Sequence, residues 1–590
     1  MDRQTLTAFT THLATSQLFS LQPDDLPVVQ RIDNSYLRAQ AIARAYRITA
    51  HDVTTLSPKF WAMHTDNIAT LDMAVMAILS VQYNLVAGII APWAEKRPEV
   101  RPILQKILDF EVSGQFMLTE QAHGLDATSM ETRADMQDDG SFILYTPNDG
   151  AAKFMPPTIP LPNASLPRYA VVFAKLFVKG EDRGVRPFVV QLSTAKALMP
   201  GVRSRMLPER AGTGPLGHSI TWFDHIKLAP WACLGSLTRP KNPKAAFQAA
   251  LWRVSVGGLA IGAVSIPAIR VSAYILGRYS LRRHVTNPNT GQAMPIIDFR
   301  TQQIPIFHAL AQSFVMEAFI DGSSTLKTFT DFTVDAQVRA GIAAAAKAAM
   351  MMHVQESCTQ LSDRLGAQGL YGHNQIINIQ LEMRGASIAE GDTPVLCIRL
   401  ATELLIGRYE LPPPKHPACL AARHEVGLFK QCREALAGKL GGQHRSDAFN
   451  PLMLPRCKGL VEAIGQRFFY EAAKDAGLEQ AILDIYEAGI IKHSPVWFAV
   501  HAGMDAPAQA AHEDAAITAA MPNLEKYLEW TGAQDYALAP IMTQNRWDAF
   551  VRRLPFYRGA DPAALKIERE FVEQQTRTRA RRYIRAAGKN

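Results

Sequence analysis

Residues 118–124 read Leu-Thr-Glu-Gln-Ala-His-Gly and stand where the chain changes from a helical to a β-type sequence. Before them, from about residue 6 to 107, apolar residues such as Leu71, Val75 and Ile78 recur at spacings of three and four, the period of a helix. After them come short runs rich in Val, Phe, Tyr, Trp and Ile, bounded by Gly, Pro and Asp, which are typical of strands. The fold class is therefore decided by what lies on either side of this heptapeptide.

The β-type region extends from about residue 110 to 235. Its predicted strands are 141–145, 169–178, 186–192 and 219–228. The proline-rich segment 156–167 is expected to be a loop, because proline cannot donate to a strand ladder.

Helical periodicity returns after Lys241. The expected helices are 245–283, 304–329, 334–365 and 388–406, and the alanine-rich run 341–352 favours close helix packing in a bundle. Residues 410–417 (ELPPPKHP) form the clearest boundary, since three consecutive prolines cannot continue a helix. The sequence thus predicts a mainly α protein with a central β domain, in four parts: 1–110, 111–238, 239–411 and 420–590, the last a second helical domain with a basic tail.

Composition indicates a folded globular chain, with 48% apolar and 20% charged residues among 590. The net charge of +8 is concentrated in the last fourteen residues, which carry six basic groups and no acid, so residues 1–576 retain only +2. A nucleic-acid binder spreads its basic surface over a folded face. We therefore expect a solvated tail and no nucleic-acid partner, with a polyanion contact of the tail as the alternative.

The six cysteines are scattered and no secretory leader precedes the first helix, so we expect reduced thiols and an intracellular location, cytoplasmic or peroxisomal. The terminal Gly-Lys-Asn does not resemble a peroxisomal address. Two apolar stretches, 73–94 and 254–269, are interpreted as buried core helices, because polar residues interrupt the first and the second is short and contains Pro267. No membrane span is expected.

Several common chemistries have no motif in this sequence. Neither His424-Glu425 nor His512-Glu513 has a second histidine four residues on, so the zinc-protease spacing is missing, and no metal site is expected. The segment 217–221 lacks the last glycine of a nucleophile elbow. Phosphate-binding loops of the P-loop and Rossmann types are also missing.

The heptapeptide 118–124 resembles the T-E-x-G-H-G segment of peroxisomal-type acyl-CoA oxidases in the acyl-CoA dehydrogenase superfamily. Further segments look like signatures of the same family in the same order: Glu131-Thr132, 186–191 (RPFVVQ), 298–303 (DFRTQQ), 366–369 (GAQG) and 389–392 (AEGD). Each alone is weak, but their common order is specific. The resemblance covers about residues 60–410, and 420–575 by architecture only.

Desaturating an acyl thioester requires a base for the α proton and an acceptor for the β hydride. No side chain accepts a hydride, so a flavin is required, and the resemblance implies FAD. Glu390 falls at the position of the family's catalytic glutamate, between apolar neighbours and Gly391, where partial burial would raise its pKa. Without the resemblance, Glu390 reads as an acid that begins a helix and is favoured there by the helix dipole.

The resemblance also implies a set of cofactor and substrate residues. Thr119 corresponds to the threonine whose hydroxyl contacts the flavin ring, although a lone threonine also fits ordinary strand propensity. Gly366 and Gly369 look like a turn that passes close to the flavin pyrophosphate across a subunit boundary, with an ordinary interhelical turn as the alternative. The remaining expected residues are Met155, Pro157, Arg282 and Gln303 for FAD, and Leu125 and Gly391 for the substrate pocket.

This chain departs from the family at two of these positions. It has Phe-Met-Pro-Pro at 154–157 where a typical oxidase has W-W-P-G-G, and Pro157 lacks the N–H and the small size of the family glycine. Leu125 replaces a serine, which affects ordinary placement of a CoA thioester. These departures favour a specialised substrate, as in a biosynthetic pathway, over housekeeping β-oxidation.

Three interpretations remain open at this point. The first is an FAD-dependent oxidase, a homodimer by resemblance, that desaturates an acyl-CoA and reduces oxygen to hydrogen peroxide. The second keeps the fold and flavin but changes the substrate to a non-CoA or carrier-bound compound, or the acceptor to a protein. The third is a flavin-free scaffold.

Overall fold

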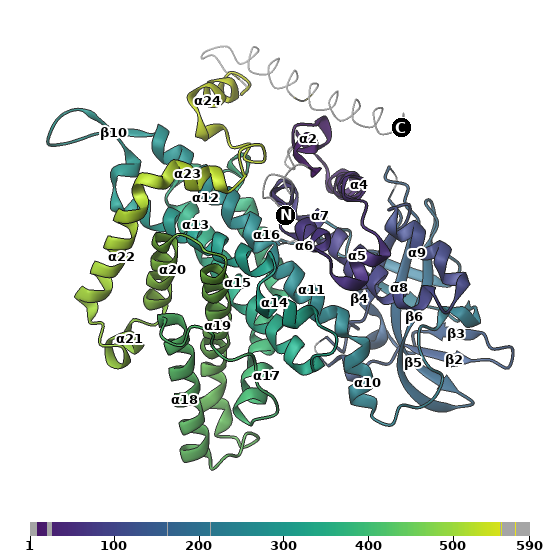
Figure 1. Cartoon of the computed structure of the whole chain (residues 1–590). Helices are drawn as coiled ribbons and strands as arrows, with labels where there is room; N and C mark the ends of the chain where they lie inside the picture. The colour runs from purple at the N-terminus through teal and green to yellow at the C-terminus, as the bar shows by residue number, and fades with distance from the viewer. Residues whose placement is uncertain are drawn as a thin grey trace.

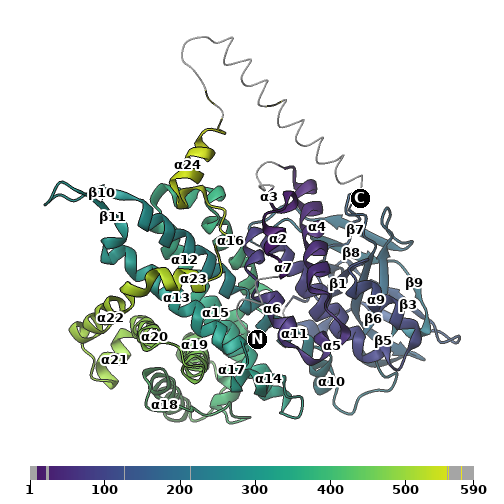
Figure 2. The same ribbon diagram turned by 45° about the horizontal axis from the view of Figure 1, so that its top comes forward.

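The computed structural model describes residues 9–20, 26–124, 126–161, 163–212, 214–554, 556 and 573. The expected basic tail 577–590 and the candidate substrate residue Leu125 lie outside these residues. The N-terminal helices and the β domain occupy one side of the molecule, a helical bundle lies in the middle, and the C-terminal helices lie on the far side of the bundle (Figures 1 and 2). The predicted fold class, mainly α with a central β domain, is confirmed.

The N-terminal part is helical as expected. Its helices are α2 (Thr11–Ala14), α3 (Gln17–Ser20), α4 (Val28–Tyr46), α5 (Ala50–Thr55), α6 (Pro58–His64), α7 (Met73–Leu79), α8 (Gly88–Ala94) and α9 (Arg101–Leu108). Between α7 and α8 the chain forms a π-helical segment, η4 (Ser80–Ala87). A π-helical turn displaces the side chains that follow it around the helix axis, and such turns recur at functional sites.

The β domain contains two sheets. The larger holds β1 (Ser113–Met117), β5 (Arg168–Val178), β2 (Arg133–Met136), β3 (Phe142–Tyr145) and β9 (Ile226–Leu228) in that order, with β6 (Glu181–Ser193) paired to β5; the smaller has the order β4 (Lys153–Met155), β8 (Ser219–Phe223) and β7 (Val202–Met206). Lys179 and Gly180, both at positive φ, make the tight turn between β5 and β6. As expected, none of the described residues of 156–167 lies in a strand.

One predicted strand is wrong. Residues 219–228 form two strands in different sheets, because Asp224 and His225 separate β8 from β9 and His225 has a φ of 47°. That left-handed residue turns the chain from the smaller sheet to the larger one.

The bundle carries the long helices. They are α10 (Pro243–Ala250), α11 (Trp252–Ala263), α12 (Ser265–Arg282), α13 (Arg300–Ile320), α14 (Ser324–Thr330), α15 (Ala336–Asp363), α16 (Ile376–Ile388) and α17 (Thr393–Leu405), with a small hairpin of β10 (His284–Thr286) and β11 (Ala293–Pro295). The alanine-rich α15 packs against α11, α12, α16 and α17, because its small side chains permit close approach.

The helix predicted over 388–406 is also wrong at its start. Helix α16 ends at Ile388 and α17 begins only at Thr393. Between them Glu390 and Gly391 have φ values of 57° and 94°, which a right-handed helix cannot contain. Glu390 therefore lies in a loop and does not begin a helix.

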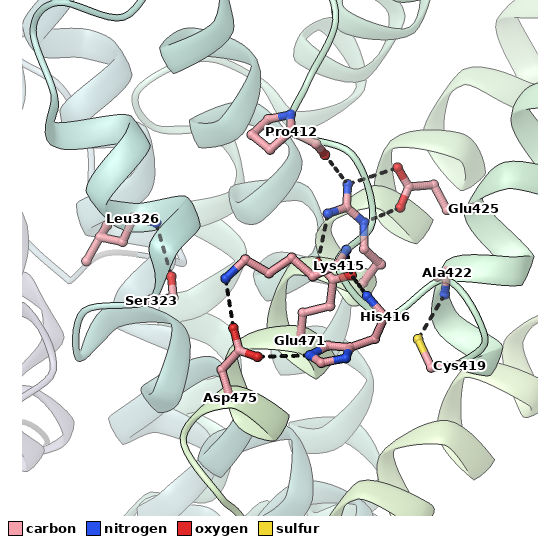
Figure 3. Close-up of polar contacts among 11 residues, drawn as sticks. Ser323, Leu326, Pro412, Lys415, His416, Cys419, Ala422, Glu425, Glu471 and Asp475 are labelled. Carbon is pink, nitrogen blue, oxygen red and sulfur yellow. Dashed lines mark hydrogen bonds and ion pairs between the residues drawn. The ribbon is translucent and has the colours of Figure 1, made fainter.

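The proline-rich boundary is fixed to the C-terminal helices rather than left as a free linker. Glu471 on α19 (Phe449–Asp475) accepts the backbone N–H groups of Lys415 and His416, at 2.7 and 3.1 Å. Asp475, one turn further on, binds the side chains of the same two residues (Figure 3). The other helices of this part are α18 (Leu420–Leu440), α20 (Gln480–His493), α21 (Pro495–His501), α22 (Ala506–Ala520), α23 (Leu524–Trp530) and α24 (Gln544–Val551).

One apolar core runs through the N-terminal helices, the bundle and the C-terminal helices, and a second core lies inside the β domain. Met73–Ala94 and Trp252–Arg282 are long and apolar enough to cross a membrane by length and composition, and both are packed inside the protein. The second stretch is longer than the 254–269 expected from sequence, since α12 continues α11 almost without interruption. Both occupy the positions of core helices.

Candidate active site

Glu390 lies in the loop between α16 and α17, and its neighbours are held by a buried lysine. Lys347 on α15 donates to the carbonyl oxygens of Ala389 and Gly391, at 2.5 and 2.6 Å. These two carbonyls belong to the residues on either side of Glu390. The side chain of Lys347 is fully buried.

The carboxyl group of Glu390 lies over a glycine of α11. A Cβ placed on Gly257 would lie 2.6 Å from Glu390 Cδ and 2.7 Å from Nδ2 of Asn84. Asn84 comes from the π-helical segment η4, where it is buried and donates to the carbonyl of Arg253 at 2.9 Å. Three elements distant in sequence therefore meet at the carboxyl group, and the site needs a residue without a side chain at position 257.

Removal from water dominates the pKa of the Glu390 carboxyl. Removal of the carboxyl from water raises the pKa of Glu390 to about 8, against the opposing effect of the Lys347 charge. Burial also lowers the pKa of Lys347 to about 8, while Glu390 and then Asp392 act to raise it. A carboxyl with a pKa near neutrality can both take and hold a proton, which is what a general base requires.

Thr119 lies just beyond the end of β1 and not within a strand, in a loop held by a buried ion pair. Its neighbour Glu120 meets Lys153 at 3.0 Å, and neither side chain is exposed. Glu120 also accepts from the hydroxyl and backbone N–H of Thr132, at 2.6 and 2.9 Å. The backbone N–H of Phe154 donates to the Thr119 carbonyl at 3.0 Å, so the loop lies beside β4.

Met155 is the last residue of β4, and Pro157 follows two residues later. Met155 has a φ of 84°, a conformation that costs a residue with a side chain and that recurs at ligand-binding sites. The carbonyl of Pro157 accepts from Nη1 of Arg168 at 3.4 Å, and Arg168 is buried. The structure therefore brings Thr119, Met155 and Pro157 together on one side of the β domain.

The remaining predicted cofactor residues form a separate group at the end of the bundle. Gln302 on α13 donates to Ser280 at 2.9 Å and to the carbonyl of Arg364 at 3.2 Å, which joins the segments that carry Arg282, Gln303 and Gly366. Gln303 is already bonded within the chain, since it donates to the Ile297 carbonyl and accepts from Arg300.

The two glycines of this group differ. Gly366 has a φ of 59° and no atom within 4 Å of the position of a Cβ, so its backbone is open. At Gly369 a Cβ would lie 2.2 Å from the Ser362 carbonyl oxygen, so that glycine is required by the packing of its own chain. Only Gly366 offers a free approach to a ligand.

The residues present fit a flavin with a pyrophosphate. Nε of Arg282 is buried and has no hydrogen-bond partner, although its Nη1 donates to Gln544 at 3.0 Å. An unpaired guanidinium donor and an open glycine turn are each suited to a phosphate oxygen. The exposed Leu370 and Tyr371 follow directly, at 75% and 54% exposure, which leaves apolar surface free for another chain.

Sequence reasoning did not identify Lys347, Asn84, Gly257 or Gln302. Lys347 had one available signal, because it is the only lysine, arginine or acidic residue between Arg339 and Glu356 in an otherwise alanine- and methionine-rich helix. An isolated charge on an apolar helix requires a buried partner. Gln302 lies within the segment 298–303 that resembles a family signature, whereas Asn84 and Gly257 are recognised only through their contacts.

Comparison with known proteins finds acyl-CoA oxidases. Residues 260–405 match the family model described as "Acyl-CoA oxidase, C-alpha1 domain". Peroxisomal acyl-coenzyme A oxidase 3 from Homo sapiens is 26% identical over 230 residues, covering 37% of this chain and 32% of the relative. Acyl-coenzyme A oxidase 3 from Yarrowia lipolytica is 25% identical over 404 residues, covering 62% and 56%. The matches thus span about a third to a half of these curated relatives.

Solved structures match over nearly the whole chain. Acyl-CoA oxidase 1 from Yarrowia lipolytica has a TM-score of 0.78 at 17% identity and covers 96% of this chain and 92% of its own. Acyl-CoA oxidase-2 from Caenorhabditis elegans, solved with FAD, ascaroside-CoA and ATP, has a TM-score of 0.73 at 14% identity, with 97% and 93% covered. The fold is therefore that of acyl-CoA oxidases. Taken together, the family model, the relatives and the structures show that this chain resembles acyl-CoA oxidases in sequence over part of its length and in fold over nearly all of it.

Proposed function

We propose that the protein is an FAD-dependent oxidase that introduces an α,β double bond into an acyl-CoA or a related acyl substrate and passes the electrons to oxygen, giving hydrogen peroxide. The observation that carries this proposal is Glu390: a carboxyl packed against Gly257, with a pKa raised by desolvation, in a fixed loop at the family's position. Glu390 takes the α proton, and FAD, when bound, supplies the acceptor for the β hydride.

The side chains around Glu390 account for its readiness to act as a base. Its carboxyl lies beside Asn84, and partial removal from water penalises its charged form, which raises its pKa and favours its accepting a proton. Because Gly257 has no side chain, the Glu390 carboxyl has room to turn toward a substrate.

The cofactor residues are proposed in two groups. Thr119, Met155 and Pro157 would lie along the flavin ring, and Arg282 and Gly366 would contact the pyrophosphate of a flavin bound to a neighbouring chain. Gln303 and Gly369 would shape that segment through the contacts they make within their own chain. The separation of these groups within one chain, and the exposed Leu370 and Tyr371, support a homodimer in which each site uses both chains. Leu125 and Gly391 complete the proposed substrate pocket.

A second candidate keeps the fold and the flavin but changes the substrate or the electron acceptor. It is favoured by Pro157, which has no N–H and whose carbonyl accepts from Arg168.

An intracellular location, cytoplasmic or peroxisomal, agrees with six buried, unpaired cysteines.

The decisive experiment begins with the purified protein. A yellow protein that releases FAD on denaturation supports the flavin, and a colourless one that cannot be reconstituted leaves the scaffold interpretation. Peroxide formation is then measured with CoA esters of different chain length and ring content. Flavin reduction by these esters without peroxide indicates a protein acceptor, and no reduction by any of them indicates a non-CoA substrate.

A further inference from the structure

Lys347 is a buried ammonium group whose bonds all converge on one short loop. Of its described contacts, the two hydrogen bonds go to the carbonyls of Ala389 and Gly391, 42 and 44 residues further along the chain. Its stem passes Gly262 and Gly258 of α11, where glycine gives it room. A methionine would fill this space without the cost of burying a charge. Packing alone therefore does not explain a lysine here.

The loop that Lys347 binds has an unusual backbone. Glu390 and Gly391 are both in the left-handed region, at φ values of 57° and 94°. Glycine adopts this conformation freely, but glutamate does so only when its surroundings impose it. Two carbonyls held by one ammonium, one on each side of Glu390, are such a constraint.

We propose that Lys347 is a positioning residue for Glu390: by holding the carbonyls of Ala389 and Gly391, it fixes the left-handed backbone that directs the Glu390 carboxyl to the space over Gly257. This inference rests on the proposed function, in which Glu390 is the base. Lys347 itself touches neither substrate nor the reacting atoms.

The ammonium group also sets the electrostatic surroundings of the base. The groups that face Lys347 are Glu390 and Asp392 on the loop and Cys397 on α17, and Lys347 is the charge that acts on Glu390. Loss of its charge should therefore raise the pH at which Glu390 loses its proton. A role limited to packing would not move that pH.

The test uses the full-length holoenzyme with Lys347→Met and Lys347→Gln. Methionine removes charge and donor, whereas glutamine removes the charge but keeps an N–H for a carbonyl. We expect anaerobic flavin reduction by an acyl-CoA to fall by roughly 10²-fold in Lys347→Met, as for other misplaced catalytic groups, and by less in Lys347→Gln. In both variants the pH profile of kcat/KM should shift to higher pH.

The matched control is Arg467→Met, since Arg467 is an equally buried cation that pairs with Glu425 and Glu471 in the C-terminal helices. This variant should lose thermal stability and keep the wild-type pH profile. An unshifted profile with near-normal reduction in Lys347→Met would overturn the proposal. So would failure of both Lys347 variants to fold under conditions in which Arg467→Met folds, because Lys347 would then serve the core.

A measurement without turnover separates this inference from the proposed function. A crystal structure of Lys347→Met should show Glu390 outside the left-handed region, and an unchanged loop would contradict the positioning role whatever the enzyme does. If the wild-type protein itself shows no flavin reduction with any acyl-CoA, the proposed function fails while the structural result on the loop still stands.

Discussion

The carboxyl group of Glu390 occupies the space that a side chain on Gly257 would fill, since a Cβ there would lie 2.6 Å from Glu390 Cδ. This contact joins α11 to the loop between α16 and α17. The position of the proposed base therefore depends on the absence of a Cβ at residue 257.

Gly257→Ala should therefore displace Glu390 and slow anaerobic flavin reduction by roughly 10²-fold, the effect of a misplacement of about 1 Å. Gly258→Ala is the matched control, because on the same helix its new Cβ would meet nothing closer than 3.5 Å. Both replacements favour the helix similarly. Equal rates in the two variants would show that the Glu390 carboxyl does not act from this place.

Reduction of the enzyme should depend on pH in a defined direction. A general base acts only when deprotonated, and burial raises the pKa of Glu390 to about 8. The rate of flavin reduction at low substrate should therefore rise with pH and level off above about 8, as measured by anaerobic stopped flow. A rate that is constant from pH 6 to 9, or that falls over that range, would exclude Glu390 as the base in this protonation state.

Arg282→Met should weaken flavin binding, because Nε of Arg282 is a buried donor without a partner among the described residues. The neighbouring Arg283→Met is the control, since Arg283 is exposed. Flavin content and the melting temperature of the holoprotein should fall only in the first variant, while the apoproteins melt alike, because bound ligand stabilises by mass action. Equal flavin content in both would place the pyrophosphate elsewhere.

A substitution at Gly369 does not test a contact with the flavin, because a side chain there would collide with Ser362 and disturb the turn whether or not flavin is bound. A substitution at Gly366 does test it, because a Cβ there would meet no atom of the chain within 4 Å.

Pro157→Gly should change the oxidative half-reaction more than the reductive one. Proline at this position removes a donor and narrows the passage beside the proposed flavin ring, while the carbonyl contact to Arg168 is retained by glycine. Reoxidation of the photoreduced enzyme by oxygen is compared with its anaerobic reduction by substrate. A change in reduction alone would assign Pro157 to the acyl pocket and favour the second candidate function.

Sequence motifs and hydrophobic periodicity predicted much of the fold and part of the candidate site. The helical period and the clusters of β-branched residues predicted the order of the parts. Glu390 was predicted as the base because an acid followed by glycine falls at a family position, and that role stays a prediction. The strand break at His225 and the loop at Glu390 could not be predicted, since each depends on a residue with a side chain adopting a positive φ under tertiary constraint.

The residues around the proposed base could not be predicted, for a different reason. Asn84, Gly257 and Lys347 are more than 40 residues away from Glu390 in sequence and meet it only through helix packing. Asn84 in addition sits in a π-helical segment, whose altered period a hydrophobic pattern does not reveal. The sequence therefore predicted the proposed base but not the residues around it.

The central claim, that Glu390 is the base of an acyl-desaturating flavoenzyme, is tested most directly by anaerobic flavin bleaching in Glu390→Gln, with Asp392→Asn as the control from the same loop. We predict that both variants fold and bind flavin, that Asp392→Asn is bleached by substrate as the wild type is, and that Glu390→Gln loses a factor of roughly 10²–10⁴ or more in the bleaching rate. Bleaching of Glu390→Gln at the wild-type rate would contradict the claim.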